Sequence, residues 1–298
     1  MNSRSWILLS LLSGFIMAGV NLIDRYVLTR LVKHAIVPLF VLGLVGLVPG
    51  LVILLVKGGP GLSWPHLLLG AAAGIAFLVM GYFYFRAAQI EEISRIVPLF
   101  YLAPVLVAVL AFLFLREHFP SKSYLGILAL IVGAVLLSSR RPLRLGFSRA
   151  FRLMALASLS LAIYTLLTKY LLSYADYWTV FAVSRVGMAL GLVPFAFRHR
   201  PELKAALAGR RGAKVAGFMT ANEALALAGS LFFTMAAAVG PISLVNALSS
   251  TQPFFVFVLS LFLALIWPRL LQEDIGWGVT VFKFLAIALM FWGLVLIV

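Results

Sequence analysis

An acidic side chain lies deep inside an apolar stretch of this sequence. Glu223 follows Asn222 within residues 214–238, far from either end of the stretch. A charged group near the centre of a bilayer costs at least about 2.5–3.5 kcal/mol, so such groups commonly mark a functional pathway. We expect the Glu223 carboxylate to face a cavity or a cation, where it could bind a substrate ammonium or carry a coupling proton. A structural ion pair or an interhelical hydrogen bond is the alternative.

A cationic counterpart lies in the preceding apolar stretch, residues 178–197. Arg185 could neutralise Glu223, or it could hold a substrate carboxylate through its planar set of donors. The structural alternative is an arginine that packs between helices and donates to the carbonyls of a neighbour. The sequence leaves both roles open.

A run of small polar residues interrupts the apolar stretch 242–266. Positions 246, 249, 250 and 253 share one face of a helix, and the run includes Asn246, Ser250 and Gln252. Such residues either join helices or line a wet surface. Pro253, and Pro104 at the matching place in the first half, each free a backbone carbonyl, so a kink there could supply an acceptor and a hinge.

Other candidates lie nearer the ends of the apolar stretches. Tyr84 and Tyr164 could serve as aromatic platforms for a cation or a ring. Glu92 and Arg95, three residues apart, could pair or gate the mouth of a cavity. Asp24, beside Arg25, is interpreted as half of an interfacial ion pair.

The composition indicates that lipid, rather than water, surrounds the helices that carry these groups. Of 298 residues 63% are hydrophobic and 11% charged, more apolar surface than a soluble protein of this length can bury. We predict an all-α integral membrane protein with ten transmembrane helices, at 5–24, 35–56, 65–87, 95–115, 121–138, 150–172, 178–197, 214–238, 242–266 and 277–298. A short interfacial helix is expected over 201–207.

The two halves of the chain repeat each other. Residues 83–115 align with 232–264, and the alignment pairs Ala87 with Ala236, Ser94 with Ser243 and Pro104 with Pro253. We predict five-helix repeats over 1–139 and 150–298. Because five is odd, the second repeat must enter the membrane inverted, and substrate sites of such proteins lie where the halves meet.

The formal charge of +15 is carried mainly by the connectors that follow odd-numbered spans. These basic residues are expected to meet lipid headgroups rather than nucleic acid, and the positive-inside rule places them in the cytoplasm and both termini outside.

Several motifs together resemble the EamA-type family of drug/metabolite transporters. They are the run 82–88, Ile93 with Ser94, Pro104, 115–117 and the Gly126 to Gly133 spacing, with Arg185 in the second half. The resemblance implies two inverted five-helix repeats around a cavity lined by the third and fourth helices of each. It also implies export of amino acids, other metabolites or drugs, and cytoplasmic termini, contrary to the charge pattern.

These observations predict a secondary transporter of a small organic solute, acting by alternating access in a bacterial inner membrane. A flippase for a lipid or lipid-linked sugar is the alternative, suggested by the phenylalanines of 254–257; a membrane-embedded enzyme or a non-transporting scaffold fits less well. There is no Walker A motif, and the four histidines have no ligand spacing, so neither ATP, a metal nor another cofactor is expected. Substrate, coupling ion and oligomeric state stay open.

Overall fold

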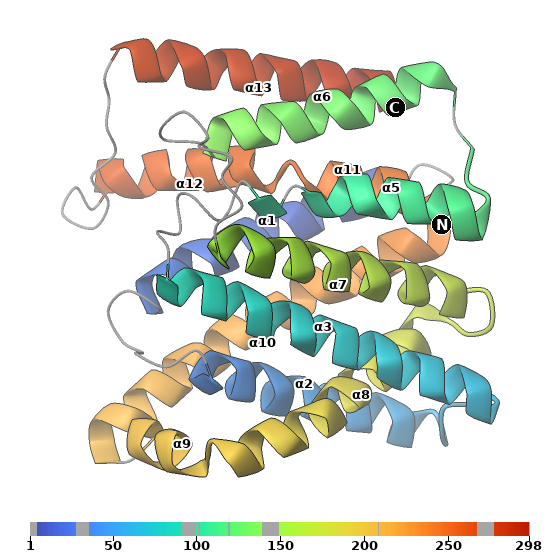
Figure 1. Ribbon diagram of the computed structural model, residues 1–298, viewed down its shortest axis with the longest axis vertical. Coiled ribbons are helices and arrows are strands. Elements are labelled where there is room, and N and C mark those ends of the chain that lie inside the picture. The colour runs from blue at the N-terminus through green and yellow to red at the C-terminus, as the bar shows by residue number, and fades with distance from the viewer. Residues whose placement is uncertain are drawn as a thin grey trace.

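The computed structural model describes residues 5–27, 36–90, 99–100, 102–118, 120–138, 149–207, 209–266 and 277–297. Throughout this part the regular secondary structure is helical (Figure 1). Long apolar segments fold this way because a helix satisfies its own backbone groups where lipid offers no hydrogen-bond partner. The helices are α1 (Ser5–Tyr26), α2 (Ile36–Val56), α3 (Trp64–Ile90), α5 (Leu102–Leu115), α6 (Ser121–Ser138), α7 (Arg149–Leu171), α8 (Tyr177–Arg198), α9 (Arg200–Leu207), α10 (Gly209–Val239), α11 (Ile242–Ser249), α12 (Gln252–Ile266) and α13 (Trp277–Ile297).

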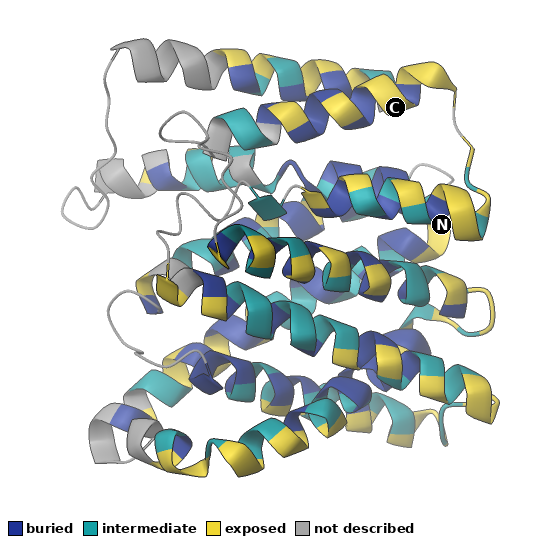
Figure 2. Cartoon of the chain, in the orientation of Figure 1, coloured by how far each residue is buried: buried dark blue, intermediate teal, exposed yellow. Residues whose placement is uncertain are grey.

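The chain is an integral, multi-pass membrane protein. Seven described stretches are long and apolar enough to cross a bilayer, and three shorter apolar helices accompany them. The outward faces of the helices carry large apolar side chains; Leu55, for example, is 78% exposed. Figure 2 shows exposed residues alternating with buried ones along the outer helices. That pattern suits lipid as the surrounding solvent, because apolar side chains have no reason to leave hydrocarbon.

The predicted ninth span is divided into two helices. α11 ends at Ser249 and α12 begins at Gln252, one residue before Pro253. A proline lacks the N–H of the helical ladder, and its ring clashes with the carbonyl four residues earlier. Pro253 therefore occupies the first turn of α12, and Pro104 occupies the first turn of α5. The predicted helix at 201–207 is confirmed as α9.

The described residues form four buried apolar clusters, of which two are large. One joins α1, α6, α11 and α13, with Trp6, Leu130, Leu248 and Met290 among its members. The other joins α2, α3 and α8 around Leu39, Leu78, Met188 and Leu192. The main helix contacts are α6 with α13, α2 with α8, α1 with α10 and α12, and α3 with α7 and α8. Both chain termini lie at one end of the bundle, opposite the end that carries α9 (Figure 1).

Glycines bring α3 and α8 into backbone contact. A Cβ atom at Gly74 would collide with the carbonyl oxygen of Ser184, and one at Gly187 would collide with the backbone of Ala71. Small residues at helix interfaces allow such close approach, which lipid-embedded helices need because they gain no hydrophobic free energy by associating.

Two charged side chains hold the turn between α10 and α11 at the end that carries the termini. The Lys169 ammonium, from α7, donates to the carbonyl oxygens of Ala237 (2.8 Å) and Gly240 (2.7 Å). The Glu117 carboxylate, just after α5, accepts from the backbone N–H groups of Ile242 (2.8 Å) and Ser243 (3.2 Å) and from the Ser243 hydroxyl (2.8 Å). A cation at a helix C-terminus and an anion at a helix N-terminus both match the helix dipoles. We call this arrangement the Glu117–Lys169 clasp.

We predict that Gly74→Ala destabilises the protein by about 1–3 kcal/mol, because the added methyl group forces α3 and α8 apart. Gly217→Ala is the matched control, since a Cβ at Gly217 in α10 meets no atom within 4 Å. Thermal unfolding of both variants in detergent measures the difference. Equal unfolding midpoints would contradict the close-packing explanation.

We predict that Glu117→Ala lowers the free energy of unfolding by about 1–2 kcal/mol, the usual loss for a helix N-terminal cap. Lys122→Ala, an exposed residue in the first turn of α6, should change it by less than about 0.5 kcal/mol. Chemical unfolding in mixed micelles compares the two. An unaffected Glu117→Ala variant would show that the clasp does not hold α11.

Candidate functional site

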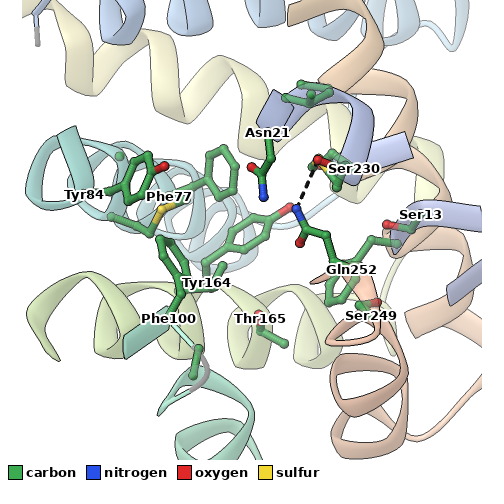
Figure 3. Close-up of a pocket in the computed structure, with 18 of the residues that line it drawn as sticks. Ser13, Asn21, Phe77, Tyr84, Phe100, Tyr164, Thr165, Ser230, Ser249 and Gln252 are labelled. Atoms are coloured by element: carbon green, nitrogen blue, oxygen red, sulfur yellow. Dashed lines mark hydrogen bonds between the residues drawn. The ribbon is translucent and has the colours of Figure 1, made fainter. Parts of the chain in front are cut away.

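A cavity of about 280 Å³ lies inside the bundle, where α1, α3, α7, α10, α11 and α12 approach one another. Its polar wall consists of Ser13, Asn21, Asp24, Tyr84, Tyr164, Thr165, Glu223, Ser230, Asn246, Ser249, Ser250 and Gln252. Figure 3 shows side chains from both halves of the chain turned toward this space. A concave, mostly apolar site with a few converging polar groups is the usual form of a small-molecule site.

The structure brings six of the eight predicted binding residues to this wall. They are Tyr84, Tyr164, Glu223, Asn246, Ser250 and Gln252, and Pro104 lines it as well. Asn222 and Arg185 stand outside the wall and contact residues that form it. Glu92 and Arg95 lie outside the described residues, so the predicted gate stays a prediction.

Two carboxyl groups belong to the cavity. Glu223, which is 7% exposed, comes from α10, and Asp24 comes from the C-terminal part of α1. Asn222 donates from its side-chain amide to Asp24 Oδ1 at 2.7 Å. Asp24 also lies close enough to Glu223 for the two charges to act on one another. The pair is therefore a shared electrostatic feature of α1 and α10.

The structure places the Asp24 side chain at the cavity. The Arg25 side chain lies outside the described part of the chain, so the expected ion pair between the two stays a prediction. Position 24 lies near the end of α1, but its side chain turns inward to the cavity. A signal was present in the sequence, because Ser13, Asn21 and Asp24 fall on one face of an otherwise apolar helix. Proximity to the end of the span obscured it.

Arg185 lies behind the wall. Its guanidinium donates to the Ser230 hydroxyl and is placed over the rings of Phe181 (4.8 Å to the centroid) and Phe77 (5.1 Å). It also interacts electrostatically with Glu223. The structural alternative in the sequence analysis had Arg185 donate to carbonyl groups of a neighbouring helix. Among the described residues its guanidinium instead contacts a hydroxyl and two rings. Arg185 thus supplies a counter-charge for Glu223 through the protein rather than a donor on the cavity surface.

Aromatic rings form one side of the cavity (Figure 3). The Phe77 and Tyr164 rings are 4.9 Å apart between centroids, and Tyr84 packs edge-on against Phe100 at 5.3 Å. These pairs come from α3, α7 and the turn before α5. Of the four rings, Phe77 and Phe100 were not predicted as site residues, since phenylalanine is common throughout the sequence.

The polar residues of 246–252 differ in the hydrogen bonds that their side chains make. The hydroxyls of Ser249, Ser250 and Thr251 donate to carbonyls of their own helix turns, where the chain passes from α11 to α12. Gln252 donates to the Met17 carbonyl at 3.0 Å and so joins α12 to α1. Asn246, 7% exposed, makes no side-chain hydrogen bond to any described residue, although it lines the cavity. Its amide is free to bind a solute.

No group of three or more His, Cys, Asp or Glu side chains with the geometry of a metal site occurs in the described part of the chain. What this part of the chain offers the cavity is therefore charge, amide and hydroxyl groups, and aromatic faces.

Comparison with known proteins places the first half of the chain. Residues 4–139 match the EamA-like transporter family, which confirms the resemblance over that region. An "Uncharacterized transporter in cobO 3'region" from Sinorhizobium sp is 38% identical over 80 residues, which are 26% of this chain and 54% of that protein. The chain therefore spans about half the length of this curated relative.

The fold is also found among solved structures. A crystal structure titled only as that of a protein aligns with 99% of this chain and 95% of its own, with a TM-score of 0.68 and 17% sequence identity. At this identity the likeness concerns the fold alone.

We predict that Arg185→Gln destabilises the protein by about 3 kcal/mol, because it leaves a buried carboxylate without its counter-charge. Adding Glu223→Gln to that variant should recover a large part of the loss, since the uncompensated charge is then gone. A double-mutant cycle on thermal unfolding in detergent measures the coupling. Additive effects would contradict an interaction between Arg185 and Glu223.

Proposed function

We propose that the chain is a secondary transporter of a small organic solute, because residues 4–139 match the EamA-like transporter family. It would act by alternating access in a bacterial plasma membrane, in the direction of efflux. The observation that carries the proposal is the cavity itself, a space of about 280 Å³ with Glu223 in its wall, inside a membrane-spanning bundle. A scaffold has no use for a charged residue at that depth.

The helix contacts support ten spans arranged as two inverted repeats of five. The repeats pair α1 with α7, α2 with α8, α3 with α10, α5 with the two helices α11 and α12, and α6 with α13. When the members of each pair are exchanged, each principal helix contact becomes another contact that is also present. The contact of α1 with α10 becomes that of α7 with α3, and α1 with α12 becomes α7 with α5. The contacts of α2 with α8 and of α6 with α13 map onto themselves. α1 and α7 also run in opposite directions (Figure 1), as inversion requires.

Alternating access requires one end of the pathway to be closed. At the end that carries the termini, Glu117 of the first half accepts from the backbone N–H groups of Ile242 and Ser243 in the second. An ion pair also joins Lys57, after α2, to Asp176, which caps α8. Rocking of the repeats would break these contacts. Pro104 and Pro253, in the first turns of α5 and α12, are the hinge positions of this proposal.

The direction of transport follows from charge and from the position of the cavity. Basic residues gather around α9, among them Arg198, Arg200 and Lys204, and the positive-inside rule assigns that end to the cytoplasm. Asp24 and Tyr84 line the cavity from the C-terminal parts of α1 and α3, which lie toward the same end (Figure 1). A solute would then enter from the cytoplasm.

Lipid flipping receives no comparable support. The phenylalanines that suggested it make ring contacts between helices: Phe254 with Phe291 at 5.4 Å and Phe255 with Phe15 at 5.6 Å. These contacts pack α12 against α13 and α1.

We predict that the purified protein in proteoliposomes catalyses counterflow of at least one member of a metabolite panel. Glu223→Gln should lower the initial rate by about tenfold, the equivalent of one charge-assisted hydrogen bond lost. Glu202→Gln, which alters a carboxylate on α9 away from the cavity, serves as the control and should keep the rate. Movement of a labelled lipid with no movement of any solute would replace this proposal with the flippase.

A further inference from the structure

Acidic side chains outnumber basic ones in the wall of the cavity. Asp24 and Glu223 are its acidic members, and no Lys, Arg or His of the described chain lines it. Arg185 is the one described cation that acts on Glu223, and it does so from behind the wall. A carboxyl group that ionises here needs a cation beside it, and one guanidinium can serve only one of the two.

These carboxyl groups also have unused capacity to accept hydrogen bonds. Asp24 accepts from Asn222, while the Glu223 carboxylate accepts no hydrogen bond from any described residue, although it is 7% exposed. An ionised carboxylate offers about four acceptor positions. Leaving them empty in a membrane interior is unfavourable. A bound group that brings both N–H donors and positive charge would satisfy them.

The neighbouring wall suits the rest of such a ligand. Tyr84 lies close enough to Asp24 for the two to interact electrostatically, and the Phe77 and Tyr164 rings form an adjacent aromatic pair. The face of an aromatic ring is negative and attracts cations, while its hydrocarbon area packs against apolar groups. Figure 3 shows these rings gathered on the side opposite Ser13 and Ser249.

We infer that the solute is a monovalent organic cation, an ammonium group attached to a flat apolar body. Its nitrogen lies between Asp24 and Glu223, and its body lies against the rings of Phe77, Tyr84 and Tyr164. This rests on the proposed transport function and narrows it. An amino-acid zwitterion fits less well, because Arg185, the group that would take its carboxylate, is engaged by Ser230 and two rings outside the wall.

A set of four phenyl compounds that differ in charge tests the inference. They are phenethylamine (cation), 2-phenylethanol (neutral), phenylalanine (zwitterion) and 3-phenylpropionate (anion), titrated into the full-length protein in nanodiscs at neutral pH. The cation should bind at least tenfold more tightly than each of the others. Equal affinities, a preference for the zwitterion or anion, or no binding of the cation would overturn the inference.

Variants locate the binding groups. Asp24→Asn and Glu223→Gln should each weaken binding of phenethylamine by about tenfold and leave binding of 2-phenylethanol within about twofold, whereas Glu202→Gln should alter neither. Unfolding midpoints identify a misfolded variant, and the selectivity of the unmodified protein decides the question independently of any variant. Weakening of cation and alcohol to the same extent would overturn the assignment of the two carboxylates.

Transport separates this inference from the proposed function. If counterflow is seen for the zwitterion or the anion and not for the cation, the inference fails and the transporter remains. If no solute of a broad panel moves and none of the four compounds binds, both fail.

Discussion

Glu223 and Asp24 place two carboxyl groups where lipid surrounds the protein, and the surrounding helices are arranged to accommodate them. Arg185 on α8 acts on Glu223 from behind, held by Ser230 and by the faces of two phenylalanine rings. Asn222 donates to Asp24. The compensation is partial, because an isolated charge in a low-dielectric interior is tolerated only with partners. Under the proposed function, the acidic group left without a partner would bind an oppositely charged solute.

These carboxyl groups and their partners stay in contact only if the helices that carry them keep fixed positions along one another. In lipid the apolar side chains supply little force for association, so close packing and polar contacts must do so. The glycines at the α3 and α8 interface provide the first, and the Glu117–Lys169 clasp provides the second. The clasp orients the start of α11, and Gln252 ties α12 to the Met17 carbonyl of α1. Asn246 between them is thereby set against the cavity.

The two halves share a scaffold and differ where a solute would be recognised. Ala87 and Ala236 are matched, and both are fully buried. Glu223 and the polar residues of 246–252 occur in the second half alone. In the proposed alternating-access mechanism, inverted repeats would make the two closed states similar in free energy, whereas an asymmetric wall would allow one defined orientation of the ligand.

Much of the fold follows from sequence because its causes are local. Long apolar runs must be helical in lipid, and proline and glycine limit them, so each predicted range overlaps an observed helix. Two ranges differ: a break between α11 and α12 replaces the kink predicted at Pro253, and within the predicted span 95–115 the helix α5 begins at Leu102. The inward direction of Glu223 was also predictable, since a carboxylate cannot face hydrocarbon.

What the sequence could not provide was the identity of the neighbours. Asp24 and Asn222 are far apart along the chain, and only the packing of α1 on α10 joins them. The packing of α8 against α3 and α10 likewise places Arg185 behind the cavity surface. The depth of a residue in the membrane follows from its position along its helix. Which side chains it contacts depends on how each helix is rotated against the others. Tertiary contacts alone determine that rotation.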